Sequence, residues 1–198
     1  MSVCALVLSA HFARAQQFDI AASGSTLYSS RNSTASQAFL PPAERGSVYP
    51  GASIDRVFDR FGYSAEFSYR YHEGIYNDYQ KYRPVLYDVN FLFEPRLKGV
   101  FPAGQAKRLK VDFLGGFGGE SVFYSSPIGT CNYQGCSTHL DSNHFLLHGA
   151  AEIRYRVWRQ FFVRPEAHYY HIFNNTSDFH SDNVFRVGVS IGYTFHTD

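Results

Sequence analysis

Strict alternation of apolar and polar side chains is the feature that most restricts how this chain can fold. From Tyr63 to His72 the two kinds of residue alternate without a break. A period of two residues is typical of β-strands with two unlike faces, because successive side chains point to opposite sides. Comparable rows lie over 87–94, 109–118, 145–157, 161–171 and 184–195, and weaker ones lie near 17–28 and 47–58. The sequence therefore predicts eight strands and an all-β fold.

The connections between the predicted strands are alternately long and short. Long polar connections are expected at 29–46, 73–83, 125–141 and 174–182, and short ones near 59–61, 99–107 and 158–160. Eight antiparallel strands with turns at one end and loops at the other form an up-and-down barrel. We therefore expect one eight-stranded antiparallel β-barrel.

Charge balance and hydropathy exclude two classes of protein. The 198 residues include 18 Lys and Arg against 17 Asp and Glu, a net charge of +1, so no basic field favours a nucleic-acid partner. The mean hydropathy is −0.27, and no apolar run reaches the roughly 18 residues of a transmembrane helix. Neither observation argues against a membrane barrel, whose strands are apolar on one face only.

The first fifteen residues have the pattern of a secretory signal peptide. The stretch from Val3 to Ala10 is apolar, and Ala13 and Ala15 are small residues where a signal peptidase would cleave before Gln16. A buried first strand or helix is the alternative, because no basic segment precedes the apolar stretch. We expect residues 16–198 to form the exported barrel domain, with no further domain after the last strand.

Alternation alone does not decide which row of side chains faces outward. A soluble lipocalin-type barrel keeps its apolar row inside around a ligand, whereas a membrane barrel turns the same row toward lipid. The polar rows contain acids and bases in similar numbers, and their bases are mostly arginines, which suit enclosed ion pairs. These features favour a charged lumen. The expected lumen charge network comprises Glu66, Arg70, Asp88, Glu94, Asp112, Glu152, Arg154, Arg156, Arg164, Glu166 and Arg186.

The final predicted strand has a further pattern at its end. Alternating residues that include Gly188, Ile191 and Tyr193 lead to the aromatic Phe195, three residues before the chain ends. This pattern resembles the C-terminal β-signal of bacterial outer-membrane proteins, and residues 16–198 resemble the small outer-membrane barrels of the protein A and X type. The resemblance implies a transmembrane barrel in the bacterial outer membrane, monomeric, surrounded by lipid and inserted by the barrel-assembly machinery.

Cys131 and Cys136 are the two cysteines that remain after removal of the signal peptide. An exported chain enters an oxidising compartment, so we expect one disulfide that closes a small loop. A zinc site that also uses His139 and His144 is the alternative, although the spacing is unlike that of a structural zinc finger.

The sequence predicts a non-enzymatic barrel with surface-exposed loops and a structural or adhesion role, without cofactor or metal. Eight strands enclose a lumen that side chains fill, so a general diffusion pore is not expected. The first alternative is a secreted, lipocalin-like carrier of a small ligand. The second is an outer-membrane hydrolase that modifies lipid A, with candidate residues His168, His171, His180, Ser181 and Asp182.

Overall fold

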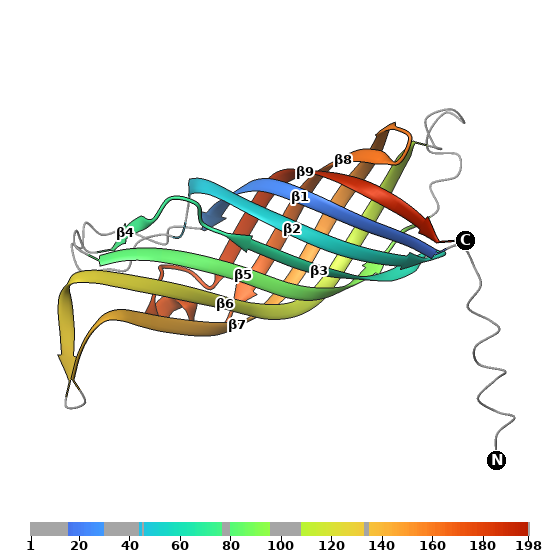
Figure 1. Cartoon of the computed structure of the whole chain (residues 1–198). Helices are drawn as coiled ribbons and strands as arrows, with labels where there is room; N and C mark the ends of the chain where they lie inside the picture. The colour runs from blue at the N-terminus through green and yellow to red at the C-terminus, as the bar shows by residue number, and fades with distance from the viewer. Residues whose placement is uncertain are drawn as a thin grey trace, which may run out of the picture.

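The structure is a computed structural model that describes residues 16–29, 44, 46–76, 80–95, 108–132 and 135–197 (Figure 1). The signal peptide predicted over residues 1–15 lies outside these residues. The described elements are β1 (Gln16–Ser29), β2 (Gly46–Phe58), β3 (Phe61–Tyr69), β4 (Gly74–Tyr76), β5 (Gln80–Phe93), β6 (Leu109–Asn132), β7 (Gly135–Trp158), β8 (Phe161–Ile172), the 3-10 helix η1 (Asn175–Ser177) and β9 (Asn183–Thr197).

Eight of these strands form one closed antiparallel barrel. Their order is β3-β2-β1-β9-β8-β7-β6-β5, and the pairing of β3 with β5 closes the cylinder. The short strand β4 pairs with β5 beyond the point where β3 ends. The predicted eight-stranded up-and-down barrel is therefore confirmed.

The two ends of the barrel differ in the length of their connections. Two-residue turns join β2 to β3 at Asp59–Arg60 and β7 to β8 at Arg159–Gln160. Asp59 and Arg159 adopt positive φ angles of 59° and 49°, which a turn this tight requires. We call this end of the barrel, which also holds the start of β1, the turn end, and the opposite end the loop end.

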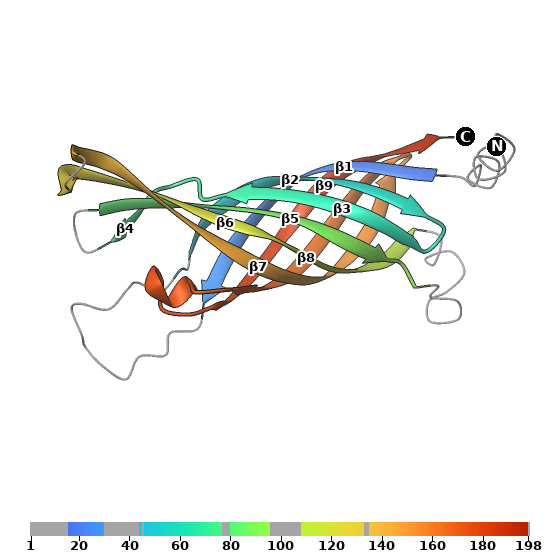
Figure 2. The same cartoon turned by 90° about the horizontal axis from the view of Figure 1, so that it is seen from below.

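Strands β6 and β7 are longer than the sequence predicts. Each has 24 residues, and the pair continues as a hairpin through the segment 125–141, which was expected to be a loop. The register shifts between Ser125 and Thr130, and from there the hairpin projects past the other strands at the loop end (Figures 1 and 2). The predicted linker at 73–83 likewise contains β4 and the start of β5. Neither segment shows in its sequence the strict alternation that marks the barrel strands.

Apolar side chains cover the outside of the barrel and charged side chains point inward. On β3, Phe67 is 46% exposed while the adjacent Glu66 is 7% exposed, and the same alternation follows the strand. Gly116 and Gly118 on β6 lie against β5 so closely that a Cβ atom there would overlap backbone carbonyl oxygens of β5. The missing side chains thus allow the tight coiling of the wall at this point. Among the described residues, no helix is long and apolar enough to cross a membrane.

Candidate functional site: the barrel interior

Arg154 on β7 organises the interior layer nearest the turn end. Its Nη1 lies 2.8 Å from Asp19 Oδ2 on β1, and its Nη2 donates to Asp112 Oδ2 on β6 at 2.7 Å. The guanidinium also lies 5.3 Å from the ring centroid of Phe162. Two other strands separate β1 from β7 in the wall. The ion pair with Asp19 therefore bridges the lumen.

Arg164 on β8 is the centre of the next layer. Its Nη1 donates to Asp55 Oδ2 on β2 at 2.6 Å and lies 3.1 Å from Glu152 Oε2 on β7. Its Nε donates to Ser190 Oγ on β9 at 3.0 Å and lies 3.8 Å from Glu166 Oε2. Arg164 is almost fully buried, so one guanidinium faces three acids inside the barrel. Its charge compensates acids that come from three different strands.

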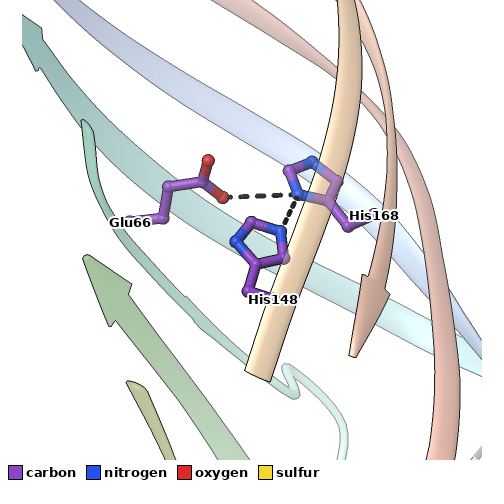
Figure 3. Close-up of side chains that lie close together, drawn as sticks. All are labelled: Glu66, His148 and His168. Atoms are coloured by element: carbon purple, nitrogen blue, oxygen red, sulfur yellow. Dashed lines mark hydrogen bonds and ion pairs between the residues drawn. The ribbon is translucent and has the colours of Figure 1, made fainter. Parts of the chain in front are cut away.

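A third arginine and two histidines form the layer above Arg164. Arg186 on β9 donates from Nη2 to Glu66 Oε2 at 2.7 Å and from Nη1 to Ser68 Oγ at 3.0 Å, both on β3. The same Nη2 lies 2.9 Å from a ring nitrogen of His168. The rings of His168 and His148 lie side by side, with His148 Nε2 2.9 Å from His168 Nδ1 (Figure 3). Glu66 faces this pair from the other wall (Figure 3).

The histidine pair also contacts residues of β5. His148 Nδ1 lies 2.7 Å from Asn90 Oδ1 and 3.1 Å from Asp88 Oδ1, both on β5. The ring of Tyr170 stacks on His148 at a centroid distance of 4.6 Å. Hydrogen bonds and ring contacts therefore connect β9, β8, β7, β5 and β3 across a single layer.

The cluster of Glu66, His148 and His168 has the residue types of a metal site. One ligand atom from each lies within 4.8 Å of the others. Arg186, however, places its guanidinium 2.7 Å from Glu66 and 2.9 Å from His168. A metal ion would meet that positive charge at contact distance. The residues present therefore fit a hydrogen-bonded charge network better than a metal centre.

An apolar layer separates these charges from the loop end. It is fully buried and consists of Leu27, Tyr49, Leu86, Leu146, Tyr170, Ile172 and Val184. Beyond it, Tyr82, Val122, Tyr124 and Phe179 form a second buried cluster. From the turn end toward the loop end, the interior thus contains three charged layers followed by apolar layers.

Two more carboxyl groups lie buried at the loop end. Glu44 belongs to the connection between β1 and β2, and Glu120 lies on β6. Their carboxyl groups neighbour each other, and the side chains of Tyr49 and Asn175 also lie beside Glu44. Burial raises the pKa of the Glu44 carboxyl to about 7, although the positive charge of Arg70 opposes that shift.

Eight of the eleven residues expected in the lumen network lie in the three charged layers. Of the other three, Arg70 is buried at the loop end and donates from Nε to the His72 carbonyl oxygen at 2.9 Å. Glu94 is half-buried at the turn end, 2.9 Å from Lys110 Nζ. Arg156 requires a correction. It is half-buried next to a bulge at the end of β7, and it forms no ion pair with any residue that the structure describes.

Sequence reasoning missed four residues of the network. Asp19 and Asp55 lie on the two weakly patterned strands, whose faces could not be assigned. His148 and His168 lie on well-patterned strands, but an inward histidine has no local mark that separates it from one at a strand end. The clearest available signal was that both histidines share a row with residues of the predicted charge network.

The proposed hydrolase residues do not converge. His168 points into the lumen, whereas His171, three residues along β8, lies on the opposite face with Nδ1 3.0 Å from Asn183 Oδ1. Ser181 donates to the Asn183 carbonyl oxygen at 3.2 Å, and Asp182 accepts from the Thr176 amide at 3.1 Å. The barrel wall thus separates His168 from His171, and His180, Ser181 and Asp182 lie in the β8–β9 connection.

The residues of the predicted C-terminal signal lie on β9 next to β1 and β8. Ile191 and Phe195 point outward and are exposed, and Tyr193 is half-buried on the same face. Gly188 faces inward, and a Cβ atom there would lie 2.6 Å from Ser25 Cβ. The strand thus has the one-sided apolar face that the predicted recognition requires, and recognition itself stays a prediction.

Cys131 and Cys136 are directly opposite each other in the β6–β7 hairpin. Their side chains lie outside the described residues. Directly opposed residues of an antiparallel pair have Cα atoms about 4.5–5.5 Å apart, a separation that a disulfide can bridge. The zinc alternative fits less well, because Cys136 and His144 are eight residues apart on one strand, about 26 Å at the usual rise.

We therefore expect maleimide to label neither Cys131 nor Cys136 in the protein purified from membranes until a reductant is added. Peptide mass mapping of the labelled sites measures this. Labelling of both cysteines without reductant would contradict the disulfide. Loss of protection after treatment with a metal chelator alone would favour the zinc site.

Several solved structures share this barrel. The N-terminal β-barrel domain of Pseudomonas aeruginosa OprF matches with a TM-score of 0.57 at 12% identity, covering 92% of this chain and 100% of that one. Neisserial surface protein A matches with 0.58 at 6%, covering 91% and 97%, and Yersinia pestis Ail with 0.53 at 12%, covering 92% and 99%. The chain has the fold of the small bacterial outer-membrane barrels. No protein-family model and no curated protein matches its sequence.

The outer-membrane barrel fold explains why apolar side chains cover the outside of this molecule and charged side chains lie inside. In that fold every backbone N–H and C=O group of the wall pairs with a neighbouring strand, so the wall can lie in hydrocarbon without unsatisfied polar groups. The exterior of this barrel presents apolar side chains from every wall strand, and the charges lie within. The expectation that the chain resembles the protein A and X type barrels is confirmed at the level of fold.

Proposed function

We propose that this protein is a non-enzymatic integral barrel of the bacterial outer membrane that presents an interaction surface at its loop end. The observation that carries the proposal is the exposed apolar exterior. Aromatic and aliphatic residues such as Phe67, Phe117 and Ile191 are about half exposed on all sides of the wall. Water-soluble monomers rarely expose contiguous apolar patches above a few hundred Å². An apolar surface that surrounds the whole barrel is suited to contact with membrane lipid.

The filled interior favours a membrane anchor over a pore. Arg154, Arg164 and Arg186 each bridge strands that are not neighbours in the wall. Such bridges occupy the centre of an eight-stranded barrel, whose lumen is only wide enough for side chains. The orientation also argues against the lipocalin-like carrier, because a carrier would have apolar residues around a central hollow.

The loop end is where an interaction role would reside. The β6–β7 hairpin projects beyond the other strands there (Figure 2). Among the similar structures, Ail is the attachment invasion locus protein and was crystallised with a heparin analogue. That likeness supports a role in attachment at the cell surface. We assign the protein to the outer membrane as a monomer, inserted by the barrel-assembly machinery through β9.

Expression of the full chain in a Gram-negative host tests this proposal. We expect the protein in the outer-membrane fraction, soluble only with detergent, and with a gel migration that changes on boiling. In planar bilayers we expect no steady single-channel conductance, with a general porin as the positive control. Recovery of a detergent-free soluble monomer would overturn the membrane assignment, and large stable conductance would overturn the closed lumen.

A further inference from the structure

His144 on β7 links the barrel wall to the β8–β9 connection at the loop end. Its Nδ1 lies 3.2 Å from the carbonyl oxygen of Phe173, at the start of that connection. Its Nε2 lies 2.7 Å from Oδ2 of Asp178, the residue that follows η1, and 2.9 Å from Ser142 Oγ on β7. The His144 side chain is 6% exposed. One nearly buried ring thus contacts the connection on both sides of η1.

Both of these contacts require the protonated ring. A carbonyl oxygen only accepts hydrogen bonds, so Nδ1 must carry a hydrogen to bond Phe173. An ionised carboxylate also only accepts, so Nε2 must carry a hydrogen to bond Asp178. A neutral imidazole has a single N–H, and its other nitrogen would turn a lone pair toward an acceptor oxygen. The imidazolium cation is therefore the form of His144 that satisfies both acceptors.

The ionisable groups that face His144 are acids. Glu120 on β6 is directly opposite His144 in the antiparallel register and is buried. Asp178 faces the ring from the β8–β9 connection, and the neighbour on β7 itself, Ser142, is uncharged. Among the described residues, no lysine or arginine forms an ion pair with Asp178. Loss of the proton from His144 would therefore leave Asp178 without its cation.

The residue after Asp178 packs into the loop end of the barrel. Phe179 is fully buried, and its ring centroid lies 5.2 Å from that of Tyr82 on β5. The amides of Asp178 and Phe179 both donate to the Asn175 carbonyl oxygen, at 3.0 and 2.6 Å. These bonds join the two residues in one turn with η1. Release of Asp178 would therefore loosen the packing of Phe179 as well.

We propose that His144 is a pH-sensitive clamp, which fixes the β8–β9 connection to the barrel at acidic pH and releases it above neutral pH. Histidine is the side chain whose charge ordinarily changes between pH 5 and 8. The clamp is complete while the ring is protonated, and the bond to Asp178 is lost when rising pH removes the proton. The connection has two more titratable side chains before β9, His180 and Asp182, and Asp182 accepts from the Thr176 amide at 3.1 Å.

The clamp would set how the loop end is presented to the exterior. That use rests on the proposed interaction role, whereas the protonation of His144 and the release of the connection can be measured without any binding partner.

NMR of the protein labelled with ¹⁵N-histidine and folded in detergent micelles tests the protonation state. At about pH 5.5 we expect both ring nitrogens of His144 at imidazolium shifts, and by about pH 8.5 we expect one of them to lose its hydrogen. The spectrum of His144→Gln identifies the signal among the nine histidines. A His144 ring that keeps one charge state over this range would overturn the clamp.

Hydrogen exchange of the unmodified protein measures the release itself. The amides of residues 174–182 are compared at each pH with an unstructured peptide of the same sequence, which corrects for the intrinsic effect of pH. Protection should fall about tenfold between the two pH values, because one charge-assisted hydrogen bond is lost. His144→Gln and Asp178→Asn should show the low protection at both. His171→Gln, which replaces a half-buried histidine on the outer face of β8, is the matched control and should behave like the unmodified protein.

Two results of this exchange experiment would overturn the clamp. One is protection that is equal at both pH values in the unmodified protein. The other is a pH dependence that survives in His144→Gln, which would assign it to another group such as His180. Heat-modifiable migration should be the same in all variants, which shows that each one folds and keeps the test separate from that of the membrane barrel.

Discussion

Replacing Arg164 with methionine is expected to lower the free energy of unfolding by about 3–5 kcal/mol, because it leaves buried acids without their cation. Asp55 Oδ2 lies 2.6 Å from the guanidinium and Glu152 Oε2 lies 3.1 Å from it. Methionine keeps much of the side-chain volume of arginine. The lost stability therefore reflects the missing positive charge more than a change in packing. Urea unfolding of the protein in lipid vesicles, followed by the fluorescence of the single tryptophan Trp158, measures the change.

Arg156→Met is the matched control for this experiment. Arg156 has the same chemistry and was expected in the same network, but it is half-buried and forms no ion pair with the described residues. Its replacement should cost less than about 1 kcal/mol. Adding Asp55→Asn to Arg164→Met should recover part of the loss, because one uncompensated acid is removed. Equal losses for Arg156→Met and Arg164→Met would contradict the assigned interior.

Placing an arginine on the outer face near mid-barrel is expected to cost about 2–4 kcal/mol of stability in vesicles. Val89→Arg makes this change on β5. Val89 is 54% exposed, and its cross-strand neighbours Ala65 and Phe117 lie on the same apolar surface. In a bilayer the new charge would meet hydrocarbon. The yield of the heat-modifiable folded form and the urea midpoint measure the loss.

Ile75→Arg provides the control for position along the barrel. Ile75 is 66% exposed on β4, which pairs only with the loop-end part of β5. There the cost should be about 0–1 kcal/mol, because the charge reaches the aqueous boundary. A Val89→Arg variant as stable as Ile75→Arg would show that the apolar exterior does not face lipid.

Strand position and strand polarity could largely be predicted from this sequence. The alternation around Phe67 and Glu66 marks both the strand and its two faces, because the period of two is a local property of the extended chain. The hairpin of β6 and β7 beyond the barrel could not be predicted. Its sequence lacks the alternation of the barrel strands, and only the pairing between the two strands defines it.

The meeting of the buried carboxyl groups of Glu44 and Glu120 beside Asn175 was likewise beyond sequence reasoning. Glu120 lies in a predicted polar row, but Glu44 and Asn175 lie in connections that the pattern marks only as polar. Their meeting depends on the tertiary positions of Glu44 and of Asn175, which are far apart in the sequence. The local sequence of either segment does not predict those positions.

The amino-acid sequence by itself determined an eight-stranded barrel with one apolar and one charged face, because those features follow from neighbouring residues. The tertiary structure alone decided which charges pair. Arg164 meets Asp55 across 109 positions of sequence, and Arg186 meets Glu66 across 120. Those contacts depend on the stagger of the strands when the sheet closes, which sets the height of each side chain in the lumen. That stagger is a property of the whole cylinder.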